Sequence, residues 1–397
     1  MRIPLAKPEI TRDDVRAVNR VLDTSRLSLG PELEEFERSV ARYVGSSHAV
    51  AVNSGTSALH LCIRALGIGP GDEVIVPSFA FIAVANAVRY EGATPVFVDI
   101  EPATLNLDPR KAEAALSPRT RAVIVVHTFG FPAKLREILA LAKRHHLFVI
   151  EDACEAFGAQ YGASKVGSLG DLGVFAFYPN KLITTGEGGI VVTHHHETAS
   201  LLRSLRNQGR RDLGVWLDHF ELGYNYRISE LNCALGNAQM KRIETALARR
   251  AWIAQRYYEE LCRLPDLSLP PLHLPQRRIS WFAYVVRLAS HFNRGHRDWI
   301  RQQMMALGIE CGRYFAPIHL QPVYQREDCR RTDLTVTETV ADRCLALPFF
   351  AALTEKQINE VCRSLGRLLR NLATVAGDER VPQLSGANLQ SADVYAD

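Results

Sequence analysis

One lysine of this sequence stands in a setting that suits covalent chemistry. Lys181 ends the segment FYPNK (177–181) and precedes the glycine-rich segment TTGEGG (184–189). A lysine between a proline turn and a glycine-rich loop can be desolvated and kept partly neutral, as a Schiff-base lysine must be. Lys181 is therefore a candidate nucleophile, and an exposed loop lysine is the alternative interpretation.

Two further polar segments follow short apolar runs. Asp152 comes just after the run at 147–150, where a carboxylate could keep a heterocyclic nitrogen protonated or could simply cap the next helix. In NSGTSAL (53–59) a glycine turn leads from a strand into a helix, whose free N–H groups and dipole suit a phosphate. Ser and Thr at a helix start are also ordinary N-caps, so neither segment decides the function alone.

The elements that must position these residues alternate along the first half of the chain. Apolar runs at 49–52, 73–76, 94–100, 122–127 and 147–151 are separated by helical stretches, one with apolar residues at 59, 62, 63 and 66. Continuous apolar runs indicate strands buried on both faces, as in a mostly parallel sheet covered by helices. The predicted fold class is α/β, with ligands bound beyond the carboxyl ends of the strands.

The length of 397 residues exceeds that of a single compact core, so two domains are expected. Past residue 240 a charged helical stretch precedes a proline-rich segment. We predict a large domain at 1–245, a smaller C-terminal α/β domain at 246–375 and a disordered tail at 376–397, where apolar periodicity ends.

Composition and charge exclude several classes of protein. The sequence has 47 Lys and Arg against 43 Asp and Glu, scattered without a basic stripe, which argues against nucleic-acid binding. No apolar run approaches the roughly 20 residues that span a bilayer, and none resembles a signal peptide. The eight cysteines form no C-x-x-C pair and no zinc spacing, so we expect reduced thiols in a cytoplasmic protein without a metal.

Taken together, the motifs resemble one family, the pyridoxal-phosphate (PLP)-dependent sugar aminotransferases of the DegT/DnrJ/EryC1/StrS type. That family has fold type I, the aspartate aminotransferase-like fold, and the resemblance covers about residues 3–370. It rests on NSGTSALHL (53–61), GPGDEVIVPSFAFIAVANAV (69–88), VDIEPATLNLDP (98–109), EDACEAFGA (151–159), FYPNK, TTGEGG, GYNYRISELNCALGNAQ (223–239) and PIHLQPVY (317–324).

The resemblance implies a role for each matching position. Lys181 is similar to the Schiff-base lysine and Asp152 to the partner of the cofactor's pyridine nitrogen. Phe81 matches the aromatic ring that stacks on the cofactor. Gly55 and Thr56 match the turn that binds its phosphate.

Five other positions are carried over in the same way. Glu155 stands where the family has Gln or Glu near the 3-oxygen of the cofactor. Asn225 resembles a residue that reaches the cofactor phosphate of a partner subunit, which implies a homodimer with shared active sites. Arg227, His319 and Tyr178 are candidate substrate contacts at the mouth of the site, and for Arg227 and His319 a structural role is an equal alternative.

One position departs from the family pattern. The family commonly has a serine five residues before the lysine, where its hydroxyl binds the cofactor phosphate, and this sequence has Ala176. Losing one hydrogen bond to a charged group costs roughly 1.5–3 kcal/mol. We therefore expect either weaker cofactor retention or a substitute donor, such as Tyr178 or a water.

The activity that the resemblance implies is transfer of an amino group from L-glutamate to a nucleotide-diphosphate-linked keto sugar. Lys181 would carry the 1,3-proton transfer, with pyridoxamine phosphate as the intermediate form of the cofactor. The motifs are most similar to enzymes that aminate a 4-keto-6-deoxyhexose, the perosamine-synthase type. A 3-keto sugar and a keto-cyclitol are alternatives, and the nucleotide (GDP, dTDP or UDP) is left open.

Two other classes share this scaffold. Sugar dehydratases of the same fold typically have histidine in place of the lysine, so Lys181 argues against that branch. A non-catalytic PLP-binding regulator is the other alternative, and the retention of Lys181, Asp152 and Phe81 together argues against it.

Overall fold

The structure is a computed structural model that describes residues 2–211, 218–327 and 329–376. Most of the predicted tail at 376–397 lies outside these residues. Within the described residues, no helix is long and apolar enough to cross a membrane, and no cluster of three or more His, Cys, Asp or Glu side chains could hold a metal.

An eight-stranded sheet forms the centre of the N-terminal part, in the order β1-β9-β8-β5-β4-β2-β3-β13. Neighbouring strands from β8 to β13 pair in parallel, and β9 is antiparallel to both of its neighbours. The strands are β1 His48–Val52, β2 Glu73–Pro77, β3 Thr94–Val98, β4 Thr120–Val126, β5 Phe148–Asp152, β8 Leu172–Ala176, β9 Gly189–Thr193 and β13 Arg330–Arg331. The sequence-based prediction of a mostly parallel α/β sheet is confirmed.

Helices cover both faces of this sheet, as the continuous apolar strands predict. One buried cluster joins α2, α5 and α6 to residues such as Ile75 and Val123, and another joins α3, α4 and α7 to residues such as Val74 and Val191. The helices are α1 Arg12–Leu22, α2 Pro31–Val44, α3 Gly55–Ala65, α4 Ala83–Tyr90, α5 Pro109–Ala114, α6 Leu135–His145, α7 His196–Arg206 and α8 Glu230–Met240.

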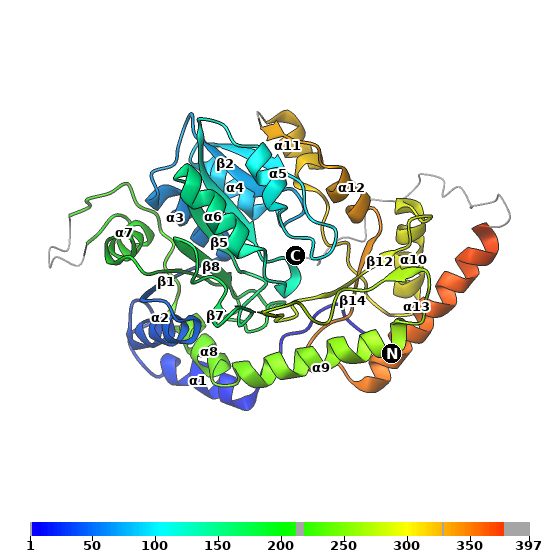
Figure 1. Cartoon of the computed structure of the whole chain (residues 1–397). Coiled ribbons are helices and arrows are strands. Elements are labelled where there is room, and N and C mark those ends of the chain that lie inside the picture. The colour runs from blue at the N-terminus through cyan, green and yellow to red at the C-terminus, as the bar shows by residue number, and fades with distance from the viewer. Residues whose placement is uncertain (1, 212–217, 328, 377–397) are drawn as a thin grey trace.

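The C-terminal part has its own antiparallel sheet of β10 Leu267–Ser268, β12 Tyr284–Leu288 and β14 Cys344–Leu347. Its core includes Tyr257, Tyr284 and Leu365 and packs under the helices α9 Ile243–Leu261, α10 Arg294–Ala306 and α13 Glu355–Ala376. Figure 1 shows α9 running from the region of α8 to α13. A third small sheet comprises β6 Gln160–Tyr161, β7 Ser164–Lys165 and β11 Arg277–Arg278.

One C-terminal segment returns to the N-terminal sheet. β13 pairs with β3 at the sheet edge, and in the chain it lies between the helices α11 Pro322–Arg326 and α12 Thr335–Ala341, both labelled in Figure 1. Asp99, just after β3, accepts hydrogen bonds from the backbone N–H groups of Val336 and Thr337 and from the Thr337 hydroxyl, at 2.7–2.9 Å. This cap fixes the start of α12 on the large sheet, although its residues fall within the range predicted for the small domain.

Candidate active site

A cavity of about 220 Å³ lies at the carboxyl ends of the parallel strands. The N-terminal part contributes residues at or within a few residues of the ends of β1, β2, β4, β5 and β8, and the C-terminal part contributes three aromatic residues. Seven of the predicted site residues line it: Gly55, Thr56, Phe81, Asp152, Glu155, Tyr178 and Lys181. Strand ends far apart in the sequence thus bring these side chains to one place.

Lys181 reaches the cavity from the turn after β8. Its backbone N–H donates to the Tyr178 carbonyl at 2.9 Å, and its side chain is 16% exposed. The Nζ atom lies 4.4 Å from the centre of the Phe282 ring and 3.9 Å from Glu155 Oε1. The amine is therefore held between an aromatic face and a carboxyl group, which suits a group that gains and loses a proton.

Asp152 is the last residue of β5 and is buried, with Oδ1 accepting from the Cys154 N–H at 3.0 Å. Its neighbour Glu151 lies outside the cavity lining and is bonded to other protein groups. The Glu151 carboxylate binds His127 Nε2 at 2.9 Å and accepts from the N–H groups of Gly167 and Gly170, contacts that lower its pKa despite burial. Because successive strand residues point to opposite faces, Asp152 lines the cavity and Glu151 holds the 167–170 loop.

Glu155 lies deep in the site. Its Oε2 accepts from the Phe129 N–H at 2.8 Å, and burial raises the pKa of Glu155 to about 7, against the lowering effects of Lys181 and of the Phe129 hydrogen bond. A carboxyl group with this pKa exchanges protons near neutral pH, next to the lysine.

The turn into α3 has almost no space for side-chain atoms. A Cβ on Gly55 would lie 2.7 Å from the Ala176 Cβ, so any larger residue would displace the end of β8. Ser54 is the N-cap of α3, with its hydroxyl accepting from the Ser57 N–H at 3.1 Å. Ser54, Gly55 and Thr56 all line the cavity, so the N-terminus of α3 faces it and offers backbone donors to an anion.

An aromatic wall, which sequence reasoning did not predict, closes the C-terminal side of the cavity. It consists of Phe282, Tyr314 and Phe315, and Phe81 lines the same cavity with 56% of its surface exposed. Burial, together with the nearby Glu155 charge, raises the pKa of Tyr314 to about 12, while an Asn180 hydrogen bond lowers it. In the sequence, Tyr314 and Phe315 are marked only by their position just before the motif PIHLQPVY, and their spacing does not indicate a site.

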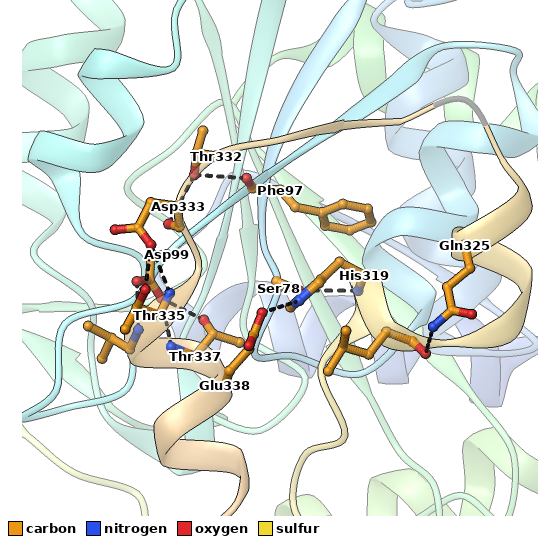
Figure 2. Close-up of polar contacts among 12 residues, drawn as sticks. Ser78, Phe97, Asp99, His319, Gln325, Thr332, Asp333, Thr335, Thr337 and Glu338 are labelled. Carbon is orange, nitrogen blue, oxygen red and sulfur yellow. Dashed lines mark hydrogen bonds and ion pairs between the residues drawn. The ribbon is translucent and has the colours of Figure 1, made fainter.

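Three predicted residues do not line this cavity. Arg227 Nη1 donates to Asn207 Oδ1 at 3.0 Å, and Asn207 forms a β-bridge with Asn225. His319 is buried between Ser78 and Glu338, with its Nδ1 2.7 Å from Ser78 Oγ and its Nε2 3.1 Å from Glu338 Oε1 (Figure 2). The structure therefore places His319 in a protein network beside the sheet.

The arrangement fits a phosphorylated pyridine cofactor. A lysine, a buried carboxylate and a helix N-terminus surround one cavity with an aromatic ring at its mouth. Asn180, which also lines the cavity, has a buried Oδ1 without a hydrogen-bond partner among the described residues. The lysine suits a Schiff-base aldehyde, the buried carboxylate suits a pyridine nitrogen, and the helix N-terminus suits a phosphate. Together with the mostly parallel sheet, they define a PLP-dependent transferase of fold type I.

Comparisons with known proteins identify the group within this class. The model of the DegT/DnrJ/EryC1/StrS aminotransferase family matches residues 8–366, and the chain belongs to this family. It is a PLP-dependent sugar aminotransferase, as the sequence resemblance predicts.

Several relatives match over nearly their whole length. The chain is 42% identical to GDP-perosamine synthase of Caulobacter vibrioides, over 93% of this chain and 98% of that protein. It is 40% identical to dTDP-3-amino-3,4,6-trideoxy-alpha-D-glucose transaminase of Streptomyces venezuelae, over 89% and 91%. Among solved structures, S. venezuelae DesV superimposes with a TM-score of 0.86 at 38% identity, covering 96% of this chain and 99% of that one.

Proposed function

We propose that this enzyme transfers an amino group from L-glutamate to C4 of a nucleotide-diphosphate-linked 4-keto-6-deoxyhexose. The 42% identity to GDP-perosamine synthase over nearly both full lengths is the observation that carries the choice of sugar. The 40% identity to a transaminase named for a 3-amino sugar keeps a 3-keto substrate as the second candidate. Lys181 in the cavity favours amino transfer over the dehydratase branch.

Bound PLP supplies an electron sink that stabilises negative charge on the carbon next to the transferred nitrogen. In the proposed site, Asp152 would hold the pyridine nitrogen in its protonated form. Gly55 and Thr56, at the start of α3, would bind the phosphate, and Phe81 would pack against the ring. Each role agrees with the position of the residue around the cavity.

Lys181 is the proposed group that moves the proton. Its Nζ would take a proton from the donor's α-carbon and return it on the cofactor side. Glu155, at 3.9 Å from Nζ and with a pKa of about 7, can exchange a proton with the lysine during this step. Phe282, Tyr314 and Phe315 help to exclude water from the same space.

The active enzyme in this proposal is a homodimer. Asn225 and Arg227 lie outside the cavity of their own chain, which supports a role for Asn225 of the partner subunit at the cofactor phosphate. Cross-linking or light scattering would measure the assembly. A fully active monomer would contradict the shared site.

The first experiment is the absorption spectrum of the purified holoenzyme before and after addition of L-glutamate. We expect the band of the aldehyde form of the cofactor to disappear and that of the amine form to grow. The aminated enzyme is then mixed with GDP-, dTDP- and UDP-linked 4-keto and 3-keto sugars, and recovery of the first band identifies the acceptor. No response to glutamate would contradict the donor, and recovery only with 3-keto sugars would replace the proposed acceptor.

A further inference from the structure

The motif VDIEPATLNLDP (98–109) is fully described by the structure, and none of its residues lines the Lys181 cavity. One of them, Asn106, has no part of its surface exposed. Its side-chain amide forms hydrogen bonds with the residues around the short turn Thr128–Gly130, which follows β4. Any effect of Asn106 on the site must therefore pass through this turn.

The Asn106 amide binds both ends of the turn. Its Oδ1 accepts from the Thr128 N–H at 2.9 Å, and its Nδ2 donates to the Phe131 carbonyl at 3.0 Å. The Thr128 hydroxyl also donates to the Leu105 carbonyl at 3.3 Å. Asparagine has an acceptor and a donor side by side, so one side chain can hold an N–H group and a carbonyl at the two ends of a turn. Asn106 thereby fixes the segment 128–131.

Phe129 lies at the centre of this segment. Its φ of 55° is in the left-handed region, which a bulky side chain adopts only where surrounding contacts fix it. Its N–H donates to Glu155 Oε2 at 2.8 Å, and its carbonyl accepts from the Phe282 N–H at 3.0 Å. The Nζ of Lys181 lies 3.9 Å from Glu155 Oε1 and 4.4 Å from the centre of the Phe282 ring. The backbone of one residue thus holds both neighbours of the amine.

The Phe129 side chain supports the aromatic wall as well. Its ring is buried and stacks on the ring of Phe315, with centroids 5.3 Å apart and planes inclined by 20°. It also stacks on the Tyr314 ring at 6.2 Å. A shift of the turn would therefore move the wall together with the two groups beside the lysine.

We propose that Asn106 is a positioning residue for Lys181, acting through the turn at 128–131. The inference rests on the proposed function, which takes Lys181 as the base. Without the asparagine amide, the turn would relax from its left-handed conformation and move Glu155 and Phe282 away from the amine. A purely structural Asn106 would instead lower the free energy of unfolding and leave the rate per folded enzyme unchanged.

The first test compares Asn106→Ala with Asn86→Ala. Asn86 is the matched control, because its Oδ1 accepts from the Tyr324 hydroxyl at 2.8 Å away from the cavity lining. In Asn106→Ala, the rate of the glutamate reaction at saturating glutamate should fall by about tenfold or more, while the Kd for PLP stays within about threefold. Asn86→Ala should leave both unchanged. An unchanged rate in Asn106→Ala, or a matching loss of rate and PLP affinity, would overturn the proposal.

The second test uses Asn106→Asp, which changes the volume of the side chain little. A carboxylate only accepts, so it keeps the bond from Thr128 and repels the Phe131 carbonyl, whereas a protonated carboxyl group can donate to that carbonyl. The rate of this variant relative to wild type should therefore rise as pH falls from about 8 to about 6, since burial favours the neutral acid. A low ratio that does not change with pH would overturn the role of the amide.

The third test needs neither cofactor nor substrate. Burial raises the pKa of Glu155 to about 7, and Lys181 and the Phe129 hydrogen bond act against this rise. Losing that hydrogen bond in Asn106→Ala should raise the pKa further, by about 1 or more. Because the folded-state pKa lies above that of the unfolded chain, the stability that Glu155→Gln gains with rising pH levels off at the folded-state value.

Urea unfolding with and without Asn106→Ala measures where the gain of Glu155→Gln levels off. This pH should be higher in the Asn106→Ala background, and an unchanged pH would contradict the positioning role. The same measurement separates the inference from the proposed function. A shifted pH in an enzyme that does not react with glutamate would support the role of Asn106 and contradict the proposed donor instead.

Discussion

The side chains around Lys181 differ from those around His319 in how fully the protein satisfies them. Around Lys181, Asn180 Oδ1 has no hydrogen-bond partner in the described part of the chain, and the lysine amine is 3.9 Å from Glu155 Oε1. The His319 network, consisting of Ser78, His319 and Glu338, is closed by bonds of 2.7 and 3.1 Å to both ring nitrogens (Figure 2).

The bonds of the His319 network assign its protons. A carboxylate only accepts, so the Nε2 of His319 donates to Glu338 and Nδ1 accepts the hydroxyl proton of Ser78. The Ser78 oxygen in turn accepts from the backbone N–H of His319 at 3.3 Å. Burial lowers the pKa of His319, which agrees with this neutral form. Polar side chains around Lys181 thus retain capacity to bind a ligand, whereas those of the His319 network join two parts of the chain.

The largest expected effect is on catalysis by Lys181→Ala. Removing the proposed base should lower turnover by about 10³-fold or more while cofactor still binds without a covalent link. The free energy of unfolding of the cofactor-free protein should change by less than about 2 kcal/mol, because the lost contacts are one cation–π pair with Phe282 and the 3.9 Å approach to Glu155. Steady-state kinetics and urea unfolding measure the two quantities.

The control for this variant is Lys165→Ala, another lysine over an aromatic ring, that of Tyr43. It should keep full activity. Substantial turnover by Lys181→Ala would show that the chemistry does not depend on this lysine. The contrast between a catalytic Lys181 cavity and a structural His319 network would then be wrong.

His319→Ala should have the opposite profile. The change leaves the buried Ser78 hydroxyl without its acceptor, which should lower the free energy of unfolding by about 2–3 kcal/mol. The rate of the glutamate reaction per folded enzyme should stay within about threefold. His319→Asn retains an acceptor near the Nδ1 position and should therefore recover more stability than His319→Gln. The bond from Nε2 to Glu338 matters less, because the Glu338 side chain is 54% exposed and water can donate to it instead.

The reverse outcome would sharpen the role of His319. If His319→Ala keeps its stability and loses the glutamate reaction, the ring contacts substrate, as the family resemblance implies. The network would then belong to the active site.

The contrast between the two regions also explains which features the sequence could predict. Asp152 stands at the end of a predicted apolar run, and parallel pairing of β4, β5 and β8 brings their ends to one edge of the sheet. Gly55 reaches the same edge because β1 and β8 are both antiparallel to β9, which lies between them. Local sequence could not separate Glu151 from Asp152, because the face on which each lies depends on strand register. Phe282 and Tyr314 reach the cavity only through the packing of the C-terminal part, so local sequence could not predict them. Strand β13 could not be predicted either, because its two residues are too few to form a recognisable apolar run.

Glu155→Gln should change the pH dependence of stability. The pKa of Glu155 is about 7 in the folded protein and about 4.3 in an unfolded chain, so between these values the folded state binds more protons. Stability of the cofactor-free wild type therefore falls as pH rises through this window. Glutamine does not titrate, so the advantage of the variant should grow from near zero at pH 4.5 to on the order of 3 kcal/mol above pH 7.

Urea unfolding of both proteins from pH 4.5 to 8 measures this difference. Glu113→Gln, at a half-exposed pair with Arg144, is the control and should shift stability by less than about 1 kcal/mol at every pH. A constant offset between Glu155→Gln and wild type would contradict the raised pKa.

The smallest expected effect is that of Ala176→Ser on cofactor affinity. Ala176, at the end of β8, lines the cavity together with Gly55, so a hydroxyl at position 176 would lie near the place where the phosphate is proposed to bind. One added hydrogen bond to a charged group is worth roughly 1.5–3 kcal/mol, so the Kd for PLP should fall by about tenfold or more. Equilibrium dialysis measures this Kd.

The control for Ala176→Ser is Ala83→Ser, which adds a hydroxyl at another alanine of the cavity lining and should leave the Kd unchanged. An unchanged or higher Kd for Ala176→Ser would mean that another donor, such as Tyr178 or a water, already fills that position. Adding Gly55→Ala to Ala176→Ser should remove the gain, because the new Cβ would lie 2.7 Å from the Cβ of residue 176 and displace one of the two backbones. A gain that survives the second change would place the phosphate away from the start of α3.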